Sequence, residues 1–94
     1  MGVAVVTGRI PEFGLADRLR LARRTAGLEQ TQLAELLATS RTTIVKYEAG
    51  QFPGERLRAH LTRKVHQWAK ETGVDYQWLL TGTPSDGAEP EGDA

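Results

Sequence analysis

The sequence contains no cysteine and no long hydrophobic run. Without thiols the chain can form neither a disulfide framework nor a thiolate metal site. No apolar stretch approaches the roughly 18 residues that span a bilayer, and the first ten residues lack the charged and apolar regions of a secretory signal. We therefore expect a cytoplasmic protein that needs no metal or other cofactor and that does not enter a membrane.

The chain also lacks an excess of charge of either sign, with 12 basic and 12 acidic residues. The charges are unevenly distributed, because residues 83–94 hold four acidic residues and no basic one. Residues 1–82 keep 12 basic and 8 acidic residues, a net charge of +4. A mildly basic body fits nucleic-acid binding, although a mixed-charge surface kept for solubility is the alternative. The acidic, apolar-poor end is predicted to be disordered.

Hydrophobic periodicity predicts one all-α domain of five helices in a chain of this length. The helices are expected at 15–26, 30–37, 41–49, from just after Pro53 to Gly73, and at 76–81, with a glycine ending four of them. The β-prone stretch Val3–Thr7 is expected to form a short strand or an arm. The predicted organisation is an N-terminal arm at 1–14, a domain at 15–82 and a disordered tail at 83–94.

The most informative segment is 28–50, where two short predicted helices meet across the turn Ala38–Ser40. Ser40 is a good N-cap for the second helix, because its hydroxyl can accept a hydrogen bond from a free backbone N–H. Apolar residues supply the contact between the two helices at Leu33, Leu37, Ile44 and Tyr47. This is a helix-turn-helix arrangement, in which the second helix enters the major groove of DNA.

This segment resembles the Cro/C1-type helix-turn-helix family of phage repressors and bacterial xenobiotic-response-element regulators. The matching residues are Gln30, Leu33-Ala34, Leu37, Ser40-Arg41, Thr43-Ile44, Tyr47-Glu48 and Gly50, and the looser resemblance runs from Leu15 to Thr81. It implies a lambda-repressor-like fold and a non-enzymatic repressor of transcription in a bacterial cytoplasm. It implies double-stranded operator DNA as the partner and no small-molecule ligand. The chain departs from the family at Glu29, where Ser or Thr is usual, and in its greater length around Gln51–Lys64.

The resemblance also implies roles for individual residues. Base edges are the expected targets of Arg41, Thr42, Val45 and Lys46, and the Arg41 fork is suited to guanine O6 and N7. Phosphates are the expected targets of Gln30, Thr39, Ser40, Thr43, Arg56 and Arg58. Arg23 and Glu48 are expected to form a structural ion pair. We expect a homodimer on DNA, joined through the last two helices or the N-terminal segment, with a monomer as the alternative.

Several residues leave alternatives open. The basic run from Arg56 to Lys64 is either a solvated face or a second DNA contact. The two histidines lie six residues apart, which is not the spacing of a helical metal pair, and both tryptophans fit core packing. No nucleophile, metal cluster or second acid supports a catalytic Glu48. A protein-interaction module on the same fold, antitoxin-like or adaptor, remains the rival function.

Overall fold

The computed structural model describes residues 13–87. Within this range the chain forms only helices: α1 (Leu15–Thr25), α2 (Gln30–Leu36), α3 (Arg41–Glu48), the 3₁₀ turn η1 (Glu55–Leu57), α4 (Arg58–Thr72) and α5 (Tyr76–Thr81). The predicted all-α, five-helix fold is confirmed. The N-terminal arm was predicted at 1–14, and nearly all of that segment lies outside the described residues. No helix between residues 13 and 87 is long and apolar enough to cross a bilayer.

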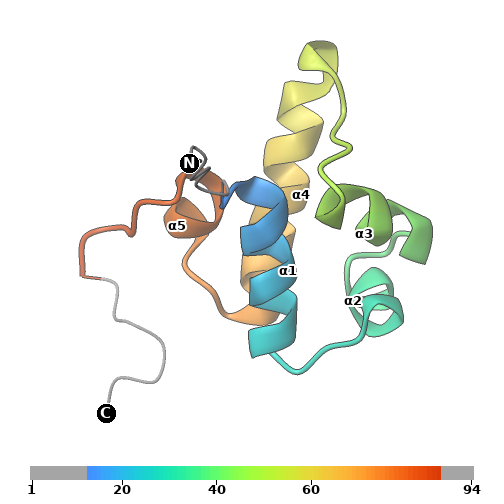
Figure 1. Ribbon diagram of the computed structural model, residues 1–94, viewed down its shortest axis with the longest axis horizontal. Coiled ribbons are helices and arrows are strands. Elements are labelled where there is room, and N and C mark those ends of the chain that lie inside the picture. The colour runs from blue at the N-terminus through green and yellow to red at the C-terminus, as the bar shows by residue number, and fades with distance from the viewer. Residues whose placement is uncertain (1–12, 88–94) are drawn as a thin grey trace, which may run out of the picture.

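The helices pack around one core in which α1 and α4 lie side by side (Figure 1). The hairpin of α2 and α3 lies on one side of this pair and α5 on the other. Six large side chains from all five α-helices are fully buried: Trp68, Leu19, Leu33, Ile44, Leu79 and Val65. The Trp68 indole Nε1 donates a hydrogen bond to the Leu19 carbonyl at 3.0 Å, which satisfies its one polar atom. Trp68 is thus a core residue, as expected, and its hydrogen bond joins α4 to α1.

The turn between α2 and α3 is held by local hydrogen bonds. Ala38 has a φ of 53°, an uncommon conformation for a residue with a Cβ atom. The Thr39 N–H donates to the Ala34 carbonyl at 2.9 Å, and the Ser40 side chain accepts from the Thr43 N–H at 3.2 Å, capping α3 as predicted. These hydrogen bonds join the end of α2 to the turn and the turn to the first residues of α3, and they hold the direction of α3 relative to α2.

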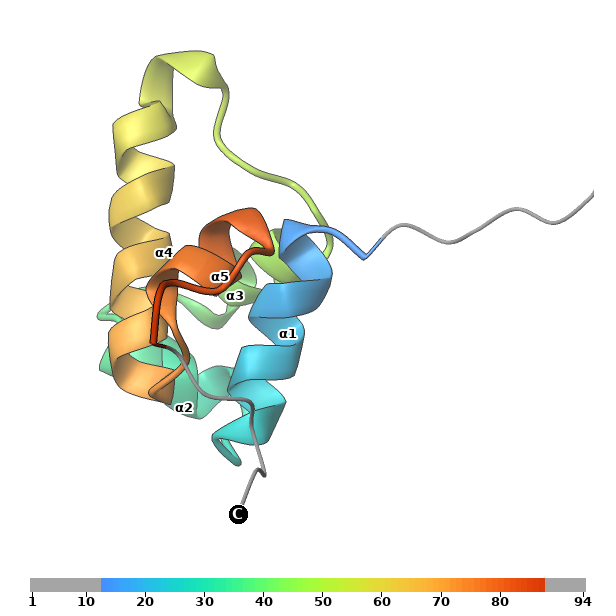
Figure 2. The ribbon, with the colours of Figure 1, turned by 90° about the vertical axis from the view of Figure 1, so that its left-hand side faces the viewer.

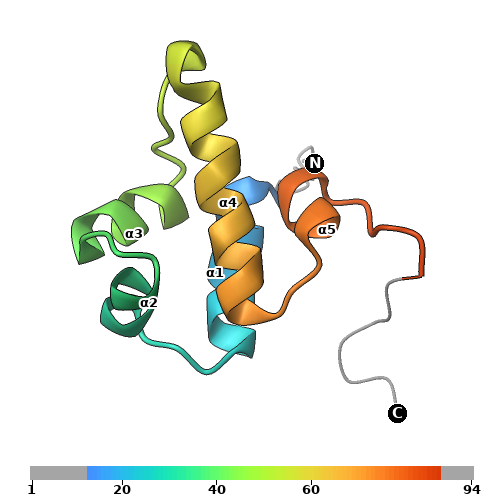
Figure 3. The ribbon, with the colours of Figure 1, turned by 180° about the vertical axis from the view of Figure 1, so that it is seen from behind.

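The fourth helix differs from the prediction at its beginning. The sequence pattern predicts one helix from just after Pro53, with Leu57 in its buried stripe. The structure has the separate turn η1 before α4 begins at Arg58, and Leu57 is 56% exposed. Val65 and Trp68, further along the same stripe, are fully buried. The prediction fails at Leu57 because this residue belongs to η1 and not to the buried part of α4. The ribbon of η1 and the first turns of α4 extends past the other helices (Figure 2 and Figure 3).

The segment after α5 begins with a contact to the domain. Asp75 caps α5 by accepting from the Trp78 N–H at 2.9 Å. The same carboxylate accepts hydrogen bonds from the Ser85 N–H at 3.0 Å and from the Ser85 hydroxyl. The first residues of the predicted tail, 83–87, are thus attached to α5, while residues 88–94 of that prediction lie outside the described range.

Candidate nucleic-acid interface

Helix α3 separates its side chains into a buried face and an exposed face. Ile44, Tyr47 and Glu48 are buried, because α3 packs against both α1 and α2. The four predicted base-contacting residues are all exposed: Arg41, Thr42, Val45 and Lys46. Their spacing places them on one side of the helix. The structure therefore brings these four side chains together on a solvent-facing surface that carries two cations and no acid.

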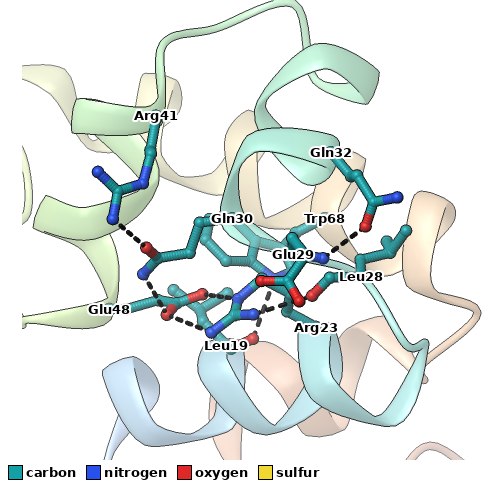
Figure 4. A network of polar contacts seen from close by, with 9 residues as sticks. All are labelled: Leu19, Arg23, Leu28, Glu29, Gln30, Gln32, Arg41, Glu48 and Trp68. Carbon is teal, nitrogen blue, oxygen red and sulfur yellow. Dashed lines mark hydrogen bonds and ion pairs between the residues drawn. The ribbon is translucent and has the colours of Figure 1, made fainter.

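A buried ion pair fixes the end of α3 to α1. Arg23 Nε donates to Glu48 Oε2 at 2.6 Å and Arg23 Nη2 to Glu48 Oε1 at 3.1 Å, so the pair is bidentate (Figure 4). Only 10% of the Arg23 side chain and 5% of the Glu48 side chain are exposed. Arg23 Nη1 also donates to the Leu28 carbonyl at 2.9 Å. These contacts join α1, the segment before α2, and α3, and they give Glu48 a structural role.

Gln30 links this ion pair to the exposed face. Its side-chain Nε2 donates to Glu48 Oε1 at 3.2 Å, and its Oε1 accepts from Arg41 Nη2 at 3.2 Å. The amide orientation matches the charges, because the NH₂ group faces a carboxylate and the oxygen faces a guanidinium (Figure 4). The chain of contacts Arg23–Glu48–Gln30–Arg41 thus connects the core to the first residue of α3.

The remaining predicted phosphate contacts fall into two groups. Thr39, Ser40 and Thr43 lie together at the beginning of α3, where the Ser40 and Thr43 hydroxyls are 3.1 Å apart. Arg56 and Arg58 lie elsewhere, in η1 and at the start of α4, and both are exposed. The structure therefore groups the hydroxyls with the α3 surface and places the two arginines on a separate projection.

Arg18 is a structural residue to which the sequence analysis assigned no role. Its relative exposure is only 9%. Its Nε donates to the Leu79 carbonyl at 2.9 Å, Nη2 to the Leu80 carbonyl at 3.1 Å and Nη1 to the Phe13 carbonyl at 3.3 Å. Its burial could have been predicted from its position, because Arg18 lies between Leu15 and Ala22 on the apolar stripe of the helix.

Tyr47 anchors the end of α3 through its ring. It stacks on Trp68 with ring centroids 6.1 Å apart and meets the edge of Phe52 at 5.6 Å. Burial raises the pKa of the Tyr47 hydroxyl, which has no hydrogen-bond partner among residues 13–87. The ring contact with Phe52 fixes the start of the loop that leads from α3 to η1.

A family model described as a helix-turn-helix domain matches residues 16–84. No curated protein matches the chain. The matched range includes all five α-helices except Leu15, the first residue of α1. The described part of the chain has no cluster of His, Cys, Asp or Glu able to hold a metal ion. Domains of this type bind DNA as regulators of transcription and are typically not enzymes. The chain therefore belongs to the helix-turn-helix domain family, consistent with the Cro/C1-type resemblance.

Proposed function

We propose that this protein is a sequence-specific regulator of transcription that reads double-stranded operator DNA with the exposed face of α3. The observation that carries the proposal is the acid-free surface formed by Arg41, Thr42, Val45 and Lys46, opposite the buried face that holds α3 in place. In a helix-turn-helix protein this surface enters the major groove. An acidic side chain on it would be repelled by the DNA backbone.

Each of the four side chains has a chemically suitable target. Arg41 can donate two parallel hydrogen bonds to guanine O6 and N7, which discriminates against a wrong base by about 1–3 kcal/mol. Lys46 reaches a guanine or a phosphate from the next turn of the helix, and Thr42 and Val45 meet the methyl groups of thymine. Arg41 therefore supplies the largest single contribution to base selection.

Polar groups beside this surface set the position of the protein on the duplex. The hydroxyls of Thr39, Ser40 and Thr43 and the remaining amide proton of Gln30 are directed to phosphates in this proposal. Contacts of this kind fix register and orientation but carry no base information. Gln30 differs from the other three because both of its side-chain polar atoms already contact charged residues of the protein.

The proposed regulator is a repressor of the phage immunity or Cro type that binds as a homodimer. One recognition helix reads only a few base pairs, and dimers on palindromic half-sites supply the missing specificity. Repression follows when the bound dimer blocks access of RNA polymerase to the promoter. Light scattering of the protein with and without its selected duplex tests the dimer, and a one-to-one complex on the full site would contradict it.

Selection of binding sites from a random DNA pool at fixed salt tests the function. The wild type is expected to select a defined motif, and Arg41→Ala and Lys46→Ala are each expected to lose preference at one position of it. Lys70→Ala is the matched control, because Lys70 is an exposed cation near the end of α4 and should select the wild-type motif. The proposal fails if the wild type selects no motif and both α3 variants bind bulk DNA equally well. A protein-interaction module would behave in that way.

A further inference from the structure

The charges of this chain are separated along its length although they sum to zero. Residues 55–64, which comprise η1 and the first two turns of α4, carry four basic residues and one acidic residue, and we call them the α4 head. The last nine residues, 86–94, carry four acidic residues and no basic one, and we call them the acidic segment. A net charge of zero leaves no overall repulsion between copies of a protein. Opposite charges on different copies are therefore free to attract one another.

The cations of the α4 head are available to a partner outside the chain. Residues 55–60 and Arg63 are all exposed. Both ion pairs formed among residues 13–87 have their arginine on α1, and neither involves the head. Figure 2 shows the head extending beyond α1, α2 and α5. The head thus presents a cationic surface that carries Arg56, Arg58, Arg63 and Lys64.

The acidic segment leaves the domain from a fixed point that lies away from the head of its own chain. Asp75, at the beginning of α5, accepts hydrogen bonds from the Ser85 N–H at 3.0 Å and from the Ser85 hydroxyl. Residues 83–87 run from α5 away from the α4 head (Figure 1 and Figure 2). Residues 88–94 add at most about 25 Å of extended chain. The direction of this departure favours a partner on another molecule.

We propose that, in the protein free of DNA, the acidic segment of one copy binds the α4 head of a second copy. This inference does not rest on the proposed function, because it requires only the charges of the two surfaces. Pro90 disfavours a helix at Glu89. In an extended bound segment, alternate residues share one side and lie about 7 Å apart, which applies to Glu89, Glu91 and Asp93. Each carboxylate can accept two parallel hydrogen bonds from an arginine of the head.

Other contacts between two copies fit the α4 head poorly. Leu57 is its one strongly exposed large hydrophobic residue, and a single leucine among cations does not make the apolar centre of a protein interface. Two heads placed face to face would repel each other. The head and the acidic segment are different surfaces, so their contact is heterologous and can join more than two copies. Exposed ion pairs contribute little individually, so the association requires several charges together and weakens with added salt.

NMR of mixed samples tests the contact between copies. The labelled protein is the neutral-segment variant Asp86→Asn/Glu89→Gln/Glu91→Gln/Asp93→Asn, labelled with ¹⁵N, which keeps the Asp75–Ser85 contact. Unlabelled wild type is then added at about 10 mM ionic strength, where the Debye length is about 30 Å. The amide signals of residues 55–64 are expected to shift with wild-type concentration and to return at about 1 M salt, where the Debye length is about 3 Å.

Two controls identify the surfaces that meet. Unlabelled neutral-segment variant should cause no shift, which separates this contact from any exchange of subunits in a dimer. Adding Arg56→Gln/Arg58→Gln to the labelled protein should make the shifts of the head several-fold smaller. Circular dichroism checks that each variant remains folded. In light scattering, the mean mass of the wild type should exceed that of the neutral-segment variant at about 10 mM ionic strength and equal it at about 1 M salt.

Three results would overturn the inference. The first is a head whose signals do not move with wild type, or move equally with the neutral-segment variant. The second is a difference between the head signals of wild type and variant that is independent of concentration, since this would place the contact within one chain. The third is a head that responds to a DNA duplex and not to wild-type protein, which would assign it to nucleic acid alone. None of these results affects the proposed function, which fails only if the wild type selects no DNA motif.

Discussion

Three of the four arginines of α1 differ in what they contact from Arg56 and Arg58, which lie in η1 and at the start of α4. On α1, Arg18 donates to three carbonyl groups, Arg20 pairs with Asp17, and Arg23 forms the buried bidentate pair with Glu48. Arg56 and Arg58 are exposed, as is Arg24 of α1, and none of the three forms an ion pair with a described carboxylate. The same residue type thus stabilises the fold where it has a partner within the domain and remains available to a ligand where it is exposed.

Burial explains this difference. Arginine stays charged at any physiological pH, so a buried guanidinium needs polar partners for its N–H groups. Helix α1 is surrounded by α3, α4 and α5, which bring carbonyl and carboxylate groups to its arginines. Arg56 and Arg58 are exposed, so water is enough to solvate their charges. The number of arginines in a helix therefore says little about DNA binding until their exposure is known.

The largest expected effect follows from removing the partner of Arg23. Glu48→Ala leaves a buried guanidinium without its counter-ion, which costs about 3–5 kcal/mol of stability. Urea denaturation measures the loss. Arg24→Ala is the control, because Arg24 is exposed on the same helix and its removal should change stability by less than about 0.5 kcal/mol. Equal losses in the two variants would show that the Arg23–Glu48 pair does not stabilise the fold.

A smaller loss is expected from Arg18→Gln. The shorter, neutral side chain leaves the carbonyls of Leu79 and Leu80 without their donors, which costs about 2–3 kcal/mol. Arg20→Gln is the matched control on the same helix, because Arg20 forms only a partly exposed pair with Asp17, and such pairs contribute about 1 kcal/mol or less. The contrast between buried and partly exposed arginines fails if Arg20→Gln destabilises the protein as much as Arg18→Gln.

Periodicity and capping signals predicted much of the fold, because both are local. The repeat of apolar residues and the caps at Ser40 and Asp75 located α3 and α5, and hydrophobic spacing placed Trp68 in the core. The sequence could not show which arginines are buried or that Leu57 is uncovered. Both depend on which distant elements surround a helix, and that information is absent from local spacing. The link from Gln30 to Arg41 depends on the same long-range packing.

Gln30→Ala is expected to reduce the discrimination between base pairs by about 1 kcal/mol, which is comparable to one net hydrogen bond. Removal of the Gln30 amide frees the Arg41 guanidinium to adopt other orientations. Competition assays with single-base variants of the selected site should show weaker discrimination at the base pair that Arg41 reads. A phosphate contact alone would instead lower the affinity for every site by the same factor. Gln32→Ala, which removes an exposed glutamine two residues away, should leave the discrimination intact.

The smallest effect is expected at Asp75 and depends on pH. Hydrogen bonds from the Ser85 hydroxyl, and from the backbone N–H groups of Trp78 and Ser85, hold the pKa of Asp75 below its usual range. A carboxyl group whose pKa is lower in the folded than in the unfolded protein stabilises the fold at pH values above its unfolded pKa of about 4. This stabilisation is lost as the pH falls through the pKa of the folded state. Asp75→Asn should flatten this part of the pH dependence in urea titrations below about pH 4. An unchanged acid profile would contradict the prediction.

The most direct test of base reading by α3 is the affinity of Arg41→Ala for every single-base variant of the selected site, measured at one salt concentration. We predict a loss of about 1–3 kcal/mol on the selected site and a loss of preference at one base pair, with the other positions unchanged. A uniform fall in affinity at all positions would make Arg41 a phosphate contact. Unchanged preferences throughout would contradict the assignment of α3 as the reading helix.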